Sequence, residues 1–194
     1  MRRRSVVFIT ALLCASAPAA ASAQKSPPAP PPAPAAAPPA PERTSSTYGD
    51  WVVRCEARPA PAPATAPPGR QCELAQTVLD ARQQPVLQIV IGTPAQMTTR
   101  VLIVQIPLNI FVPGEARLML EDKDKPVPVG IKTCLPRGCF AETDLTDALA
   151  ARLRAMGDAP AHFDYKDAAQ AQVSVPVSLK GFATALDALA RERS

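Results

Sequence analysis

Alternation of apolar and polar residues is the clearest pattern in the chain. Over residues 47–56, every second residue falls on one face, which holds Trp51 and Cys55, and we expect that face to be buried. The alternation resumes over residues 72–79, again with a cysteine and apolar residues on one side. Gln76 is the polar member of this row, and the pattern leaves open whether it is buried or at the rim. If it is buried, its amide needs hydrogen-bond partners.

The next two apolar segments differ, because they are apolar on nearly both faces. Residues 86–92 and 100–107 are rich in β-branched side chains, which is typical of central strands covered above and below. Shorter patterns predict further strands at residues 116–121, 127–133, 161–166 and 172–179. Strands this numerous, separated by turn residues, predict one mainly β domain, a β-sandwich of about seven to nine strands.

Two segments change to helical periodicity. In residues 145–156 one stripe carries the apolar side chains, after a possible cap at Thr143 or Asp144 and before Gly157. A shorter apolar stripe spans residues 182–189 and precedes a charged tail. We therefore expect one or two short peripheral helices that cover an edge or an open end of the sandwich.

The segments before the alternation predict export. Residues 1–23 combine Arg2–Arg4, a short apolar run and a small-x-small site, so we expect a signal peptide cleaved near Ala23. The alternatives, a membrane anchor or a lipoprotein attached at Cys14, fit less well, because the run is short and Cys14 lies inside it. Residues 24–46 are a Pro/Ala-rich linker expected to be disordered with some stiffness, and residues 47–191 form the β domain. No other stretch is apolar and long enough to span a membrane, which predicts a periplasmic or secreted, cell-surface location.

Charge excludes one class of partner. The net charge is +4, but Arg2, Arg3 and Arg4 supply three of the 21 basic residues and residues 1–23 contain no acid. The remaining chain is nearly neutral, which does not fit a nucleic-acid-binding protein and makes no strong case for an anionic membrane surface.

Four of the five cysteines lie after the signal peptide, and in an exported domain they imply disulfides. Three pairings are possible, and proximity in sequence favours Cys55 with Cys72 and Cys134 with Cys139. A zinc site and a redox pair are the alternatives. Both fit less well, because the spacings are those of neither a zinc knuckle nor a two-residue redox motif.

Candidate chemistry beyond the cysteines is sparse. His162 is the only histidine, and with Asp164 nearby it is the one residue around which a hydrolytic site could be built. No nucleophile elbow, phosphate-binding glycine loop or carboxylate pair accompanies it, so a surface histidine is the expected reading. We predict no catalytic, cofactor-binding or metal-binding residues, and no cofactor. Arg137 lies at the tip of a hairpin expected between Cys134 and Cys139, and the alternatives there are a solvated turn residue and a contact with a partner.

Combined motifs carry a resemblance to a known family. Five sequence features together resemble the signature of the invasion-associated locus B family. They are Tyr48-Gly49-Asp50-Trp51, Cys55, the segment from Cys72 to Gln76, the later cysteine pair and Ser178-Leu179-Lys180-Gly181-Phe182. The resemblance spans residues 47–190 and implies an immunoglobulin-like β-sandwich in an exported protein of Gram-negative bacteria. Some members in pathogens are linked to host-cell invasion, and no catalytic residues are implied. The long linker and the Pro-rich insert at residues 58–69 depart from the family pattern.

These patterns lead to three functional hypotheses. The first is an exported, non-enzymatic envelope or surface protein that acts as an interaction module for an unknown protein or envelope component. The second is a periplasmic structural or chaperone-like envelope-stress factor. A thiol-redox or hydrolytic enzyme is the third and the least supported by the sequence.

Overall fold

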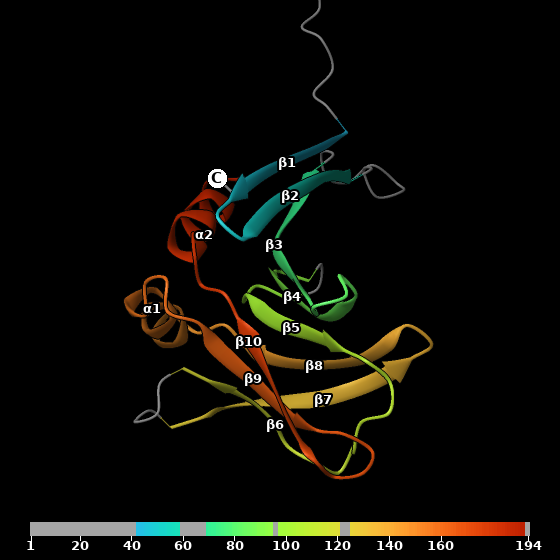
Figure 1. Cartoon of the computed structure of the whole chain (residues 1–194). Coiled ribbons are helices and arrows are strands. Elements are labelled where there is room, and N and C mark those ends of the chain that lie inside the picture. Colours follow the sequence, from blue (N-terminus) through green and yellow to red (C-terminus); the bar gives the residue numbers. More distant parts are fainter. Residues whose placement is uncertain (1–41, 59–68, 95–96, 121–124, 193–194) are drawn as a thin grey trace, which may run out of the picture. The chain divides into compact units, whose positions relative to one another are not determined.

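Ten strands and two helices form the part of the chain that the computed structural model describes, residues 42–58, 69–94, 97–120 and 125–192 (Figure 1). The expected signal peptide, the first part of the expected linker, most of the Pro-rich insert and residues 121–124 lie outside these residues. The elements are β1 (Arg43–Tyr48), β2 (Trp51–Arg58), β3 (Gly69–Leu79), β4 (Pro85–Gly92), β5 (Val101–Ile106), β6 (Ala116–Met119), β7 (Val127–Leu135), β8 (Gly138–Asp144), α1 (Asp147–Ala155), β9 (Ala161–Lys166), β10 (Gln172–Val177) and α2 (Phe182–Arg191).

All strands belong to one antiparallel sheet in the order β1-β2-β3-β4-β5-β8-β7-β6-β9-β10. The sheet curls so that its first half, β1–β5, faces the half that contains β6, β9 and β10 (Figure 1). Ile89 and Leu102 from the first half therefore border the same small internal space as Leu118 and Ala161 from the second. The predicted β-sandwich with peripheral helices and two disulfides is confirmed, with both layers supplied by one continuous sheet.

The inward faces of the strands follow the predicted alternation. Trp51, Val53 and Cys55 of β2 are buried, as are Cys72 and Leu74 of β3. The buried residues of neighbouring strands lie directly opposite one another, so each apolar row continues across the sheet. Val53 lies opposite Leu74, and Leu74 lies opposite Ile91. One apolar core results, which the two helices complete.

Three details differ from the sequence prediction. Residues 43–46, assigned to the linker, form part of strand β1, because this polar segment gains a ladder of hydrogen bonds to β2 as an edge strand. The expected strand 47–56 is interrupted at Gly49 and Asp50, which form the turn of the β1–β2 hairpin. On the outer face of the sheet Val90 and Ile103 are half-buried, so among the described residues no second layer covers that face of β4 and β5.

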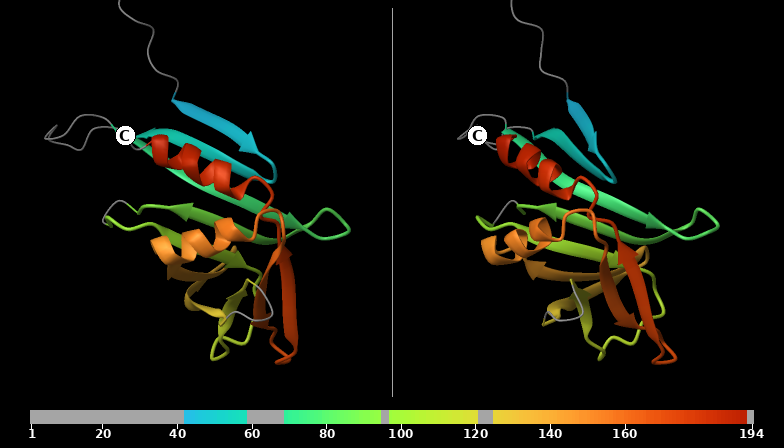
Figure 2. Two further views of the ribbon diagram at one scale, coloured as in Figure 1. Left: turned by 90° about the vertical axis from the view of Figure 1, so that its left-hand side faces the viewer. Right: turned by 60° about the vertical axis from the view of Figure 1, so that its left-hand side comes forward.

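Both helices form where periodicity predicted them. Thr146, rather than Thr143 or Asp144, caps α1, since its hydroxyl accepts a hydrogen bond from the Leu149 amide. Helix α2 packs on the inner face of β1–β3, and α1 lies next to it (Figure 2). An ion pair between Arg154 of α1 and Asp187 of α2 links the helices at 2.6 Å.

Candidate functional site

The residues of the sequence signature converge on one junction between the start and the end of the domain. The indole Nε1 of Trp51 donates a hydrogen bond of 3.0 Å to the backbone carbonyl of Ser178. Gln76 is buried, and its Nε2 donates to the same carbonyl at 2.9 Å and more weakly to the carbonyl of Asp50 at 3.4 Å. The question of the Gln76 amide is thus resolved: its nitrogen is bound, while its Oε1 has no partner among the described residues.

Backbone and side-chain bonds tie Asp50 to the same C-terminal segment. The Ser178 hydroxyl donates to Asp50 Oδ2 at 2.6 Å, and the Asp50 amide donates to the Lys180 carbonyl at 3.1 Å. The Lys180 amide in turn donates to Ser178 Oγ at 3.2 Å. The turn between β1 and β2 is therefore fixed to the connection between β10 and α2, which we call the junction: Tyr48–Trp51 and Gln76 together with Ser178–Phe182.

Two glycines allow the segments of the junction to approach closely. A Cβ on Gly49 would lie 2.4 Å from the Lys180 carbonyl oxygen, and one on Gly181 would lie 2.3 Å from that of Tyr48. Both residues also have positive φ, +59° and +80°. The ring of Phe182 then packs edge-to-face on Trp51 with the centroids 5.2 Å apart.

The junction is thus a structural device. The hydrogen bonds of the Trp51, Gln76 and Ser178 side chains all lie within it, and the internal space beside Trp51 and Phe182 is only about 10 Å³. Sequence reasoning named Tyr48, Gly49, Asp50, Trp51 and Gln76 but did not recognise that Ser178 bonds to this group and that Gly181 packs closely against it. A signal was present, because a glycine stands in each of the two motifs that meet.

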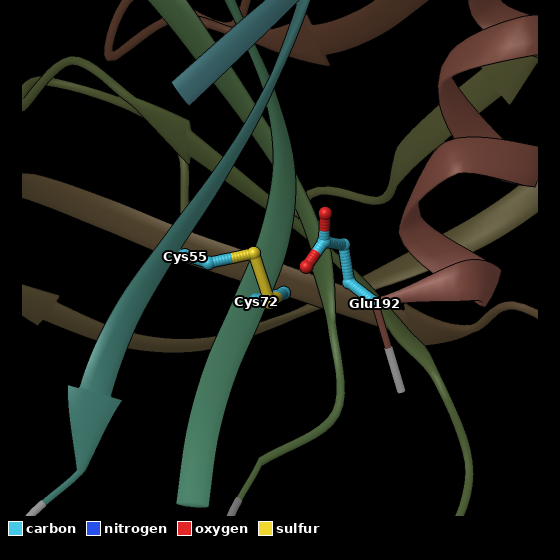
Figure 3. Close-up of side chains that lie close together, drawn as sticks. All are labelled: Cys55, Cys72 and Glu192. Atoms are coloured by element: carbon cyan, nitrogen blue, oxygen red, sulfur yellow. A yellow bond between two sulfur atoms is a disulfide. The ribbon is translucent and has the colours of Figure 1, made fainter. Parts of the chain in front are cut away.

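Both predicted disulfides form between directly opposed residues of neighbouring strands. Cys55 of β2 bonds Cys72 of β3 with both side chains buried, and Cys134 of β7 bonds Cys139 of β8 next to the hairpin tip. Glu192 brings a carboxylate close to the first pair, so that its oxygen and the two sulfurs lie within 4.8 Å of one another (Figure 3). Because the sulfurs are bonded to each other, they are not thiolate ligands, and this cluster does not form a metal site.

His162 lies exposed on the outer face of β9. Ser174 Oγ is 3.5 Å from His162 Nδ1, and the same hydroxyl donates to Asp164 Oδ1 at 2.6 Å. A catalytic triad instead requires the serine to donate to the histidine and the acid to hold the far side of that ring. The arrangement therefore does not activate Ser174, in agreement with the surface role predicted for His162.

Within the described ranges, two groups have displaced pKa values, and both lie in structural contacts. Burial, with a smaller effect of nearby Asp167, raises the pKa of Tyr165 above 10.0. The hydrogen bond from Arg154 lowers the pKa of Asp187. Neither group is part of a catalytic arrangement.

Arg137 lies at the tip of the β7–β8 hairpin, where the sequence placed it, and borders an open groove of about 450 Å³. Among the described residues its side chain has no carboxylate partner. Large apolar side chains are exposed around the same end of the strands, namely Leu79 at the end of β3, Leu108 after β5 and Leu135 at the end of β7. The turns and connections that carry them lie on the right-hand side of Figure 1.

Comparison with known proteins agrees with these structural observations. A family profile described as invasion associated locus B (IalB) protein matches residues 51–190. The crystal structure of invasion associated protein B from Bartonella henselae is similar with a TM-score of 0.63 and 22% sequence identity, covering 76% of this chain and 95% of that chain. No curated protein sequence matches. The resemblance predicted from the signature motifs is confirmed, and the chain belongs to the invasion associated locus B (IalB) family.

Proposed function

We propose that this chain is an exported, non-enzymatic interaction module of the bacterial envelope or surface. The observation that carries the proposal is that Leu79, Leu108 and Leu135 are exposed at the end of the sheet that also carries Arg137. Large apolar side chains grouped on a surface favour association with a partner. The signature residues, by contrast, bind one another in the junction and stabilise the fold.

Export is supported by three features. Residues 1–23 carry the pattern of a signal peptide, and both disulfides belong to an oxidising compartment. None of the helices in the described ranges has the length and apolar character needed to cross a bilayer. Whether the mature chain acts in the periplasm or at the cell surface is decided by fractionation of the native cells with and without protease treatment of intact cells.

A role in thiol chemistry is less well supported. Cys55 and Cys72 are 2% and 7% exposed, so a substrate thiol has little access to that bond. Alkylation of the native protein without reductant tests this point, because a redox enzyme in its reduced form would incorporate label at a cysteine pair. We expect the four cysteines of the domain to take up no label, whether the cells are grown under oxidising or under mildly reducing conditions.

Cross-linking in the envelope tests the interaction role. A photo-cross-linker placed at residue 108 or 135 is expected to trap a reproducible partner in living cells. The matched control is position 97, since Met97 is also exposed, at 43%, but lies in the β4–β5 connection at the other end of these strands. Equal trapping from all three positions, or trapping from none, would contradict the proposal.

A further inference from the structure

The groove beside Arg137 is lined by polar side chains in its centre and by apolar side chains at its border. Its floor is the outer face of β3, β4 and β5, where Thr77, Gln88 and Gln105 form one row across the strands. Apolar side chains from the strand ends, Pro85, Val86 and Pro107, border this row. The tip of the β7–β8 hairpin borders the groove through Arg137, whose side chain is exposed. The volume, about 450 Å³, is in the range of sites that hold a ligand or a short segment of chain.

The hairpin tip is held firmly over the groove. The Gln105 amide donates to the Arg137 backbone carbonyl at 2.8 Å. Gly138 allows the close approach, because a Cβ there would lie 2.6 Å from the Ile106 carbonyl oxygen. The Cys134–Cys139 disulfide closes the same hairpin. The backbone that carries Arg137 is therefore fixed before any ligand arrives, which lowers the entropic cost of binding.

Charge and hydrogen-bonding groups indicate the kind of ligand. Arg137 is the one charged residue among those that line the groove, so the groove is positive and fits a carboxylate. The Nε2 groups of Gln88 and Gln105 already donate to Thr77 Oγ1 and to the Arg137 carbonyl. Their amide oxygens and one remaining N–H each can still accept from and donate to a polypeptide backbone. The flanking Leu108 and Leu135, 47% and 51% exposed, offer contacts for apolar side chains.

We propose that this groove binds an extended polypeptide segment of a partner, with an acidic side chain on Arg137 and apolar side chains on either side of it. The inference rests on the proposed function and specifies its binding surface. The chain's own Pro/Ala-rich stretches are poor occupants, because residues 24–41 and 59–68 contain no aspartate or glutamate. A second copy of the chain is the remaining competitor and is resolved by the experiment.

The test uses the mature protein and a displayed library of linear peptides in which each acidic peptide has a Gln/Asn-matched counterpart. Acidic peptides with flanking apolar residues are expected to be enriched over their counterparts. The strongest peptide is then measured by fluorescence anisotropy against wild type, Arg137→Lys, Arg137→Gln and the control Lys166→Gln. Lys166 is also exposed and basic but lies on β9, outside the groove lining.

Arg137→Gln is expected to weaken binding about tenfold or more, Arg137→Lys less, and Lys166→Gln not at all. Thermal unfolding verifies that the variants fold. Equal enrichment of the neutral peptides, or binding that is indifferent to Arg137→Gln, would overturn the inference and leave the interaction role standing. Self-association that Arg137→Gln abolishes in sedimentation, without peptide binding, would assign the groove to a second copy. Failure of both the peptide selection and the cellular cross-linking would remove the proposed function itself.

Discussion

The indole N–H of Trp51 and the backbone carbonyl of Ser178 are joined by a hydrogen bond across 127 positions of the sequence. Gln76 donates to the same oxygen, so one carbonyl serves two buried donors. This shared acceptor makes the two side chains energetically dependent on each other. The following predictions start from that dependence.

Trp51→Phe is expected to lower the free energy of unfolding by about 1–3 kcal/mol, since it removes one donor and part of the core volume. Gln76→Met should cost less, because it also removes the unpaired Oε1 and leaves Ser178 bonded to Trp51. The double variant leaves the carbonyl without either donor, so its loss should exceed the sum of the single losses. Urea unfolding followed by far-UV circular dichroism measures this, and strict additivity would argue against the shared acceptor.

Gly49→Ala and Gly157→Ala separate close packing from backbone conformation. The two glycines have nearly the same φ, +59° and +61°, but a Cβ at Gly157 meets nothing within 4 Å. Gly157→Ala should therefore lower the free energy of unfolding by about 1 kcal/mol, because alanine adopts the left-handed conformation less easily than glycine. Gly49→Ala should cost several times more, because its methyl group collides with the Lys180 backbone. Similar unfolding midpoints for the two variants would show that the junction yields easily.

The two disulfides should contribute unequally. They enclose sequence separations of 17 and 5 residues, and the loop-entropy relation gives about 3 kcal/mol for Cys55–Cys72 and about 2 kcal/mol for Cys134–Cys139. Paired Cys→Ala replacements, each measured by guanidinium unfolding, check the order. The Cys55/Cys72 variant also truncates two buried side chains, whereas in the other pair only Cys139 is buried, which increases the difference.

Alkaline pH should destabilise the protein through Tyr165. Its pKa is raised above 10.0 by burial, so the folded state favours the neutral phenol. The resulting stability is present below pH 10 and is lost as the pH rises through the raised pKa. Tyr165→Phe should cost about 1 kcal/mol or less at pH 7, and this deficit relative to wild type should shrink as the pH rises above 10. Parallel stability curves for the two proteins from pH 7 to 11 would contradict this.

Local patterns predicted much of the fold for a physical reason. Burial of one face sets the period of Trp51, Val53 and Cys55, and neighbouring strands bring paired cysteines together, so both are readable from nearby residues. β1 escaped prediction because Arg43–Ser46 is polar and gains its order from the ladder to β2. The junction escaped because contacts between residues 49–51 and 178–182 depend on how the whole sheet curls. The groove beside Arg137 likewise needs the register of β5 with β8.

The junction also has a consequence for the timing of folding. Trp51 opens the second strand, yet its hydrogen-bond acceptor and its aromatic neighbour Phe182 are among the last residues of the chain to be synthesised. A nascent chain that has emerged only as far as Val177 lacks both, together with α2, which covers β1–β3. Native packing of β1–β3 must therefore wait until residues 178–191 have emerged. Until then the core on this side of the sheet stays unfinished.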